Sequence, residues 1–134
     1  MERKDILSFL DKYDFDKEKF IIISGAALVI LGIKEETNDI DIAVSDDLYD
    51  ELVSNYDCQF EKEICGYQVW FIDKIINFSK HYYDDLEYVY YDGYKVQSLD
   101  SILKIKQKLN REKDKKDVEK IKKYLKKEKS LGCQ

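Results

Sequence analysis

The part of the chain that decides the fold is residues 21–44, with the sequence IIISGAALVILGIKEETNDIDIAV. The β-branched run at its start predicts a short buried strand. A Ser24-Gly25 turn follows and leads into an apolar helix over residues 26–31. A second strand is expected over residues 39–44, so this stretch predicts a strand, a helix and a strand in close succession.

Two carboxylates in the second strand indicate a cation site. Asp39 and Asp41 are separated by one residue, so strand alternation places them on the same face, about 6.5–7 Å apart at the backbone. Carboxylates within an apolar strand are costly unless a cation or hydrogen bonds compensate them. Just upstream, the Ser24-Gly25 turn opens a helix whose free N–H groups favour a phosphate. A phosphate site joined to a metal site by one short helix predicts chemistry on a nucleoside triphosphate.

This arrangement resembles the signature of the nucleotidyltransferase superfamily. In that signature a Gly-Gly or Gly-Ser turn is followed, about a dozen residues later, by Asp-x-Asp or Asp-x-Glu. The pattern is similar to a small prokaryotic branch that contains the minimal nucleotidyltransferases and the AbiEii-type toxins. A second matching block consists of Lys106 and residues 111–118, REKDKKDV. One departure is Ser24, which stands where the superfamily pattern has its first glycine.

The resemblance implies how the metal would be held. Asp39 and Asp41 would be catalytic ligands of Mg²⁺ or Mn²⁺, which prefer oxygen donors. Members of the superfamily often have a third carboxylate on a neighbouring strand, as a metal ligand or as the base for the acceptor hydroxyl. Asp73, at the end of an apolar run, is the candidate for this role, although it could simply terminate a strand. Glu61 and Glu63 are weaker candidates on the preceding strand.

The resemblance also implies which residues would hold the nucleotide. Ser24 and Gly25 would bind the β- and γ-phosphates, and Thr37 belongs to the same nucleotide-binding signature. Lys106 would act in the site, where it and Arg111 could neutralise the triphosphate or the departing pyrophosphate. Each of these two cations could instead belong to a surface ion pair.

The expected reaction is the Mg²⁺-dependent transfer of an NMP from an NTP to a hydroxyl acceptor. The acceptor could be an antibiotic, a protein hydroxyl or a tRNA end, and the protein could be one half of a toxin–antitoxin or phage-defence pair. The partner would then be an antitoxin, or a second copy of the chain in a homodimer. The alternative is a catalytically inactive nucleotide- or RNA-binding module with the same fold, because fold and function separate readily.

The predicted fold is α+β, a small mixed sheet flanked by helices, and the resemblance implies the minimal, polymerase-β-like nucleotidyltransferase fold. One domain is expected over residues 1–134, with a core over about 5–96 and a helical part over about 98–128. The sequence predicts a helix over 5–13, a helix from about 45 to 56, hairpins at 58–72 and 87–96, and two C-terminal helices that start after Ser98 and near Lys113.

Charge is unevenly distributed along the chain. The formal net charge is −5, but residues 104–129 carry about +8 and the remainder about −13. The basic segment could be a solvated helical face, or a cationic wall that faces a triphosphate or an RNA end. No stretch approaches the ~20 apolar residues that span a bilayer, so a cytoplasmic protein without a membrane partner is expected.

Six of the eleven tyrosines lie between Tyr82 and Tyr94. They could form an aromatic surface on which a nucleobase stacks. They could equally reflect the preference of tyrosine for strands with one wet edge, and the alternation of Tyr88 and Tyr90 favours this second interpretation.

Overall fold

A central mixed sheet of seven strands organises the described part of the protein, for which we use a computed structural model. The structure describes the backbone of residues 1–81 and 83–132, and the side chains of residues 1–81 and 83–128. The strands are β1 (Phe20–Ile23), β2 (Ile40–Val44), β3 (Cys58–Ile64), β4 (Tyr67–Ile72), β5 (Ile76–Ser79), β6 (Tyr88–Tyr91) and β7 (Tyr94–Gln97). The helices are α1 (Arg3–Asp11), α2 (Ser24–Ile30), α3 (Asp46–Asn55), α4 (Leu99–Leu109) and α5 (Lys115–Gly132), with 3₁₀ helices η1 (Lys17–Lys19) and η2 (Glu112–Asp114). The predicted α+β class is confirmed.

The order of the strands puts β2 in the middle of the sheet. The order is β3-β4-β5-β2-β1-β7-β6. Strand β2 is antiparallel to β1 and parallel to β5, and β1 is parallel to β7. The predicted hairpins are β3–β4 and β6–β7, whose turns contain Gly66 and Gly93, each with φ +83°. A positive φ is accessible to glycine at little cost, which explains why these turns were readable from the sequence.

The main hydrophobic core lies on one face of β2. Ile40, Ile42 and Val44 are fully buried there and pack in one cluster with apolar residues of α1, α2 and α3. Because side chains alternate along a strand, Asp41 and Ala43 face the other side. That side has only a small buried cluster around Ala43, so Asp41 sits on the more thinly covered face of the sheet.

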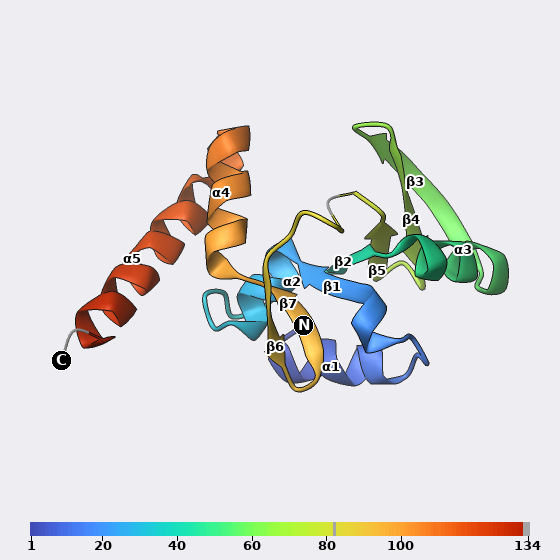
Figure 1. Cartoon of the computed structure of the whole chain (residues 1–134), viewed down its shortest axis with the longest axis horizontal. Helices are drawn as coiled ribbons and strands as arrows, with labels where there is room; N and C mark the ends of the chain where they lie inside the picture. The colour runs from blue at the N-terminus through green and yellow to red at the C-terminus, as the bar shows by residue number, and fades with distance from the viewer. Residues whose placement is uncertain (82, 133–134) are drawn as a thin grey trace.

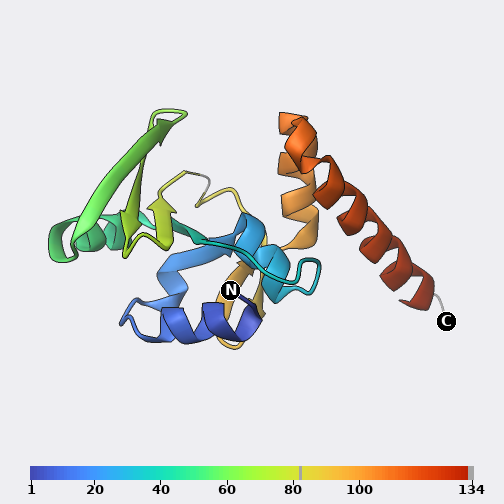
Figure 2. The same cartoon turned by 180° about the vertical axis from the view of Figure 1, so that it is seen from behind.

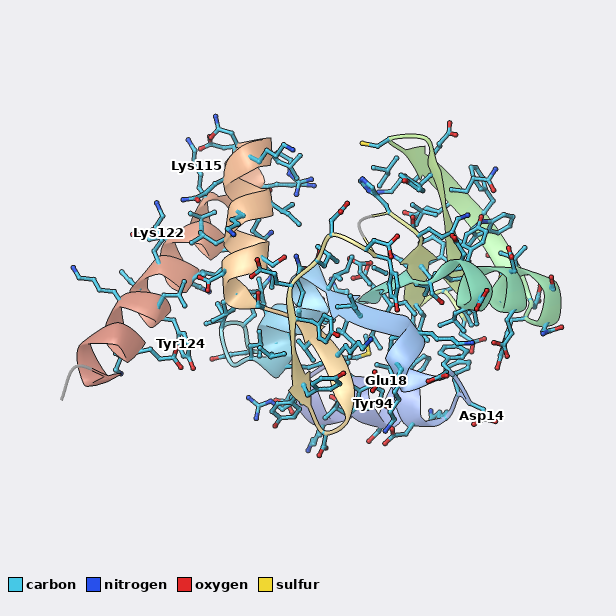
Figure 3. All side chains as sticks on the ribbon, in the orientation of Figure 1. Asp14, Glu18, Tyr94, Lys115, Lys122 and Tyr124 are labelled. Atoms are coloured by element: carbon cyan, nitrogen blue, oxygen red, sulfur yellow. The ribbon has the colours of Figure 1, made fainter. Side chains whose placement is uncertain are left out.

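The tip of the β3–β4 hairpin, at one edge of the sheet, and helix α4 project in the same direction, on either side of the centre of the sheet (Figures 1 and 2). Helix α5 runs back along α4 and away from the sheet, and Lys115 and Lys122 point outward from it (Figure 3). Ser45 caps α3 and Ser98 caps α4, each hydroxyl oxygen accepting a backbone N–H at 3.2 Å. The two expected C-terminal helices are therefore present.

Strand β5 was not predicted from the sequence. It has four residues, Ile76–Ser79, between a tight turn and an irregular segment, and it pairs with both β2 and β4. Its place beside β2 matters for the site described below. Within the described residues, no helix has the length and apolar character needed to cross a membrane.

Candidate active site

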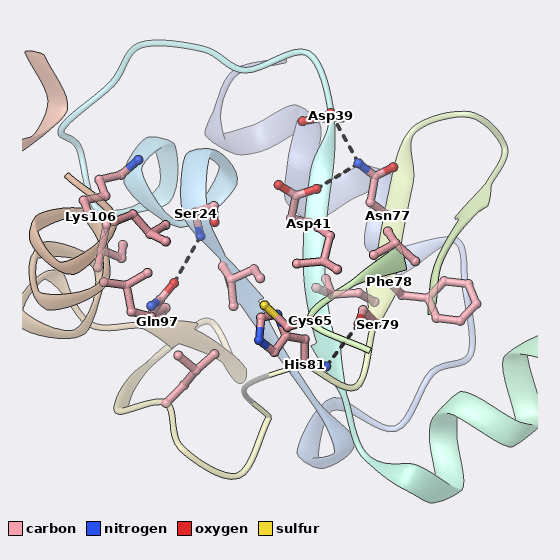
Figure 4. Close-up of a pocket in the computed structure, with 18 of the residues that line it drawn as sticks. Ser24, Asp39, Asp41, Cys65, Asn77, Phe78, Ser79, His81, Gln97 and Lys106 are labelled. Carbon is pink, nitrogen blue, oxygen red and sulfur yellow. Dashed lines mark hydrogen bonds between the residues drawn. The ribbon is translucent and has the colours of Figure 1, made fainter. Parts of the chain in front are cut away.

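Asp39 and Asp41 line a cleft of about 550 Å³ on the thinly covered face of the sheet. Asp39 immediately precedes β2 and Asp41 is its second residue, so both project to the same side, as the alternation predicts (Figure 4). The tip of the β3–β4 hairpin and one face of α4 contribute to the walls. The volume lies within the range of small-molecule sites, about 300–1,000 Å³.

The environment of Asp41 disfavours its charge. Burial, followed by the negative charge of Asp39, raises the pKa of Asp41 to about 6. A hydrogen bond from Asn77 opposes the shift, and the charge of Glu61 adds to it. A carboxylate held in this state is compensated most directly by a cation, as the sequence argument expected.

Asn77 joins the two carboxylates. In the parallel pair β2–β5, Asn77 is the register partner of Asp41. Its Nδ2 donates to Asp41 Oδ1 at 2.9 Å and to Asp39 Oδ2 at 3.5 Å (Figure 4). Sequence reasoning missed this residue because it missed β5. The alternation of Ile76, Asn77 and Phe78 was the one available signal, and it is too short to be decisive.

Glu61 brings a third acidic group to the cleft. The register of β3 against β4 shifts between Phe60 and Lys62, and a bulge of this kind re-aims the side chain that it contains. Glu61 lines the cleft, and its Oε2 is buried with no hydrogen-bond partner among the described residues. The other carboxylate oxygen, Oε1, pairs with Lys62 at 3.8 Å. A buried oxygen without a donor is uncommon in folded proteins, so Oε2 is available to accept a ligand or a proton.

Asp73 does not take this place. Strand β4 ends at Ile72, and Asp73 lies exposed in the following turn, with φ +52°. Its carboxylate accepts a hydrogen bond from the hydroxyl of Tyr13, beyond the end of α1, and burial together with this bond raises the pKa of Tyr13. Asp73 is not among the residues that line the cleft. The expectation that it would join Asp39 and Asp41 is therefore corrected, because the chain turns before reaching them. Glu63, the other rival candidate, is exposed on β3 and also does not line the cleft.

Ser24 adopts a backbone conformation that glycine prefers. Its φ is +56°, which explains why the superfamily pattern has glycine here and indicates local strain in this chain. The Ser24 N–H donates to Gln97 Oε1 at 3.2 Å, and Gln97 in turn donates to Ser101 Oγ at 3.0 Å. Ser24 lines the cleft, but its amide is already engaged in this structure.

Gly25 and Thr37 form the contact behind Ser24. A Cβ added to Gly25 would lie 3.2 Å from Thr37 Oγ1, a tight contact that would require the Thr37 side chain to shift by a few tenths of an ångström. The Thr37 hydroxyl donates to the backbone oxygen of Asp39 at 3.3 Å. Neither Gly25 nor Thr37 lines the cleft. Their contact joins the start of α2 to the segment that carries Asp39.

Lys106 of α4 lines the cleft across from Asp39 and Asp41 (Figure 4), and Arg111, just after the end of α4, lines it as well. Both bind Asp114: Lys106 Nζ lies 2.7 Å from Oδ1 and Arg111 Nε lies 2.6 Å from Oδ2. Asp117 lies 3.7 Å from Lys106 Nζ. Burial alone would raise the pKa of Asp114, but the bonds from Lys106 and Arg111 outweigh burial and lower it. The two predicted cations are thus in the cleft and are held by acidic partners.

The remaining walls of the cleft are largely apolar. Ile102, Ile105 and Leu109 of α4 lie on one side and Leu86 lies below. None of the described tyrosines lines the cleft. Tyr88 and Tyr90 are exposed on β6, which agrees with the strand interpretation, and Tyr82 lies outside the described residues.

The donor set fits a hard divalent cation that shares its ligands with a substrate. Within the described part of the chain, no three His, Cys, Asp or Glu side chains are arranged to hold a metal ion by themselves. Asp39 and Asp41 offer two carboxylates, and Mg²⁺ is commonly held by one or two carboxylates together with waters and substrate phosphates. Asn77 Oδ1, which is buried and has no hydrogen-bond partner among the described residues, is a further hard oxygen in the same cleft.

Comparison with known protein families assigns the chain to a nucleotidyltransferase family. Residues 3–128 match the family model described as "Nucleotidyltransferase of unknown function (DUF6036)". Since the match spans most of the chain, the protein belongs to this family. No curated protein and no solved structure matches the chain. The superfamily resemblance found in the sequence is confirmed at this level.

Proposed function

We propose that the protein is a Mg²⁺- or Mn²⁺-dependent nucleotidyltransferase that moves an NMP from an NTP to a hydroxyl acceptor. The observation that carries the proposal is one cleft with two acidic groups on the sheet, Asp39 and Asp41, and two cationic groups on α4 and the loop after it, Lys106 and Arg111. A triphosphate needs a metal site and cationic partners at once, and this cleft has residues for both.

Each group has a distinct part in the proposed reaction. Asp39 and Asp41 hold the cation, which supplies Lewis-acid stabilisation of charge on the transferred and leaving phosphates. Lys106 and Arg111 turn from Asp114 to the phosphates and neutralise the pyrophosphate as it leaves. The acceptor oxygen forms a bond to the α-phosphorus while the bond from that phosphorus to the bridging oxygen breaks, and Glu61 takes the hydroxyl proton.

The test is transfer of label from each of the four α-³²P-NTPs, with Mg²⁺ or Mn²⁺, to components of a bacterial extract. Labelled product is expected with the wild type and not with Asp39→Asn or Asp41→Asn. Asp47→Asn is the matched control, because it makes the same change at a side chain that is 85% exposed on α3 and does not line the cleft. Treatment of the product with protease or ribonuclease, and separation of small molecules, distinguishes a protein, a tRNA end and a small molecule such as an antibiotic as acceptor. Label that persists in both Asp variants would contradict the proposal.

One observation favours a second candidate, a catalytically inactive nucleotide-binding module. Lys106 and Arg111 are both paired with Asp114, and the side chain that hydrogen-bonds Asp41 is the amide of Asn77. This candidate predicts that calorimetry detects binding of an NTP with Mg²⁺ while no labelled product or pyrophosphate forms under any condition.

A role as a growth-arresting toxin, with an antitoxin as partner, would use the same proposed activity and needs a test of its own. Induced expression of the wild type would then stop bacterial growth, while expression of Asp41→Asn at the same level would not. Equal growth of the two strains would contradict the toxin role without bearing on the transfer reaction.

A further inference from the structure

Asn77 bridges the two carboxylates that are proposed to hold the cation. It is fixed beside Asp41 by the register of β5 against β2. Its NH₂ group donates to Asp41 at 2.9 Å and reaches Asp39 at 3.5 Å. A donor with two N–H groups is the neutral group best suited to hold two acceptor-only side chains together.

The other end of the same amide is unsatisfied. Asn77 Oδ1 is buried and has no hydrogen-bond partner among the described residues, which is uncommon for a buried acceptor. The reverse orientation of the amide would direct the Oδ1 lone pairs at the carboxylates of Asp39 and Asp41. Without a cation, the donor orientation is therefore favoured even though it leaves Oδ1 orphaned.

We propose that Asn77 is a positioning residue whose amide turns over when a divalent cation binds at Asp39 and Asp41. In the metal-free protein its NH₂ holds the two carboxylates together, and in the loaded protein its Oδ1 faces the cation or a water bound to it. This inference rests on the proposed function, because it requires a cation at the two aspartates.

Three properties of the site support this exchange. An amide has nearly the same shape in both orientations, so a half-turn about its last side-chain bond exchanges nitrogen and oxygen with little repacking. The cation repels the N–H groups and attracts the carbonyl dipole, which reverses the preference set by the carboxylates. A side-chain amide oxygen is also an ordinary ligand for hard cations. After the amide rotates, Asn77 Oδ1 has a partner, whereas before the rotation it has none among the described residues.

The first experiment observes the amide directly. The side-chain NH₂ signal of Asn77 is assigned in a ¹⁵N–¹H spectrum by its loss in Asn77→Asp, and Mg²⁺ is then added without nucleotide. The Asn77 proton signals are expected to move upfield as the hydrogen bond to Asp41 is lost. Asn55, exposed at the end of α3, is the internal control and should not shift. Mg²⁺ that shifts the backbone signal of Asp41 but leaves the Asn77 amide unchanged would overturn the inference.

The second experiment measures Mn²⁺ affinity by calorimetry. Asn77→Leu keeps the approximate shape without donor or acceptor and should bind Mn²⁺ about tenfold more weakly, on the scale known for residues that orient metal ligands. Asn77→Asp adds a charged oxygen and should bind about tenfold more tightly. Gln59→Glu is the matched control: it makes the same change from amide to acid on the exposed side of β3, outside the cleft, and should bind as the wild type does.

The outcomes separate this inference from the proposed function. If the wild type binds no Mn²⁺ in the absence of nucleotide, the inference is contradicted, and the proposed function then depends on the transfer assay alone, because there the NTP completes the cation site. If the wild type and both Asn77 variants bind equally while Asp39→Asn does not bind, only the role of Asn77 is contradicted. If Asn77→Leu fails to fold in EDTA, the wild-type NMR titration and the Asn77→Asp affinity still decide the question.

Discussion

At the scale of single residues, Asp41 combines burial with a nearby like charge. Asp39 and Glu61 oppose its ionisation, while Asn77 and the more distant Lys62 favour it. The pKa of about 6 in the folded protein is well above the ordinary value of 3.8. The folded state therefore binds the Asp41 proton more tightly than the unfolded state does, and this group lowers the stability as the pH rises from about 4 to 6.

We predict that Asp41→Asn stabilises the metal-free protein at pH 7.5. The variant removes the buried charge and keeps an oxygen that accepts the Asn77 hydrogen bond. The free energy of unfolding should rise by about 1–3 kcal/mol, the scale of a pKa shift of two units after relaxation. Near pH 4 the difference should vanish, because Asp41 is then protonated in the folded wild type. Urea unfolding in EDTA at both pH values checks this, with Asp47→Asn as the exposed control. An equal difference at both pH values would rule out the titration of Asp41 as its cause.

At the scale of elements, the start of α2 is fitted against the segment that leads into β2. The contact is made by Gly25 and the side chain of Thr37, whose hydroxyl also bonds the Asp39 backbone. We predict that Gly25→Ala costs about 1–2 kcal/mol, because the new methyl group meets the Thr37 hydroxyl and overpacks the contact. In a Thr37→Ala background the same change should cost much less, since the hydroxyl is absent.

A double-mutant cycle by urea unfolding measures this coupling, which should be about 1 kcal/mol for residues in contact. Additive effects of the two changes would mean that the close approach does not constrain the chain. Loss of transfer activity in Gly25→Ala, restored by the added Thr37→Ala, would link the same contact to the placement of Asp39.

A second connection between elements is the ion cluster that ties α4 to η2 and the start of α5. Asp114 is 4% exposed and accepts from Lys106 and Arg111. Asp114→Asn leaves Arg111 without its counter-charge and Lys106 with Asp117 as its remaining acidic partner, so we predict a loss of about 2–4 kcal/mol. Glu112→Gln, which disturbs only an exposed pair with Lys115, should change stability by less than about 1 kcal/mol.

The pKa of Asp114 is lowered in the folded protein, so its contribution is present at neutral pH and is lost as the pH falls through the folded pKa. The advantage of the wild type over Asp114→Asn, measured by urea unfolding at pH 7 and in the acid range, should shrink in acid. Hydrogen exchange should report faster opening of α5 in the variant than in the wild type. Unchanged protection of α5 would show that other contacts hold the helix.

The sequence predicted the features that depend on a few neighbouring residues and missed those that depend on pairing between distant strands. Hairpin turns at Gly66 and Gly93, the caps Ser45 and Ser98, and the alternation around Asp39 and Asp41 act over a few residues, and all appear in the structure. Strand β5 is set by its pairing with β2 and β4, which no local pattern records. Asn77 was missed with it. The bulge that directs Glu61 into the cleft and the turn that removes Asp73 from it likewise depend on pairing between strands.

At the scale of the whole molecule, the structure shows where the basic and the acidic parts of the sequence lie relative to the cleft. The basic C-terminal segment provides one wall of the cleft, and the acidic body provides the other. The sequence left two interpretations open, a solvated face and a cationic wall, and the structure has basic residues both on the solvent-exposed side of α5 and in the lining of the cleft. Lys115 and Lys122 point outward from α5, whereas Lys106, Arg111 and Lys113 line the cleft (Figure 3). What charge counting could not show is that two of these three, Lys106 and Arg111, share the single carboxylate of Asp114, and that Lys106 also pairs with Asp117.

Lys113 therefore gives the clearest test of the cationic wall. It lines the cleft, and no ion pair engages it in the described structure, whereas Lys106 and Arg111 must first leave Asp114. We predict that Lys113→Gln weakens binding of an NTP with Mg²⁺ about fivefold at low salt, the scale of one partly exposed charge pair. Lys126→Gln, the same change on the exposed part of α5 away from the cleft, should bind as the wild type does. Titration of a fluorescent NTP at 50 and 300 mM KCl checks both, and the difference should shrink at higher salt as the charges are screened. Equal weakening by the two substitutions would mean that the basic C-terminal segment attracts the nucleotide through its overall charge. Lys113 in the wall of the cleft would then have no specific part in binding.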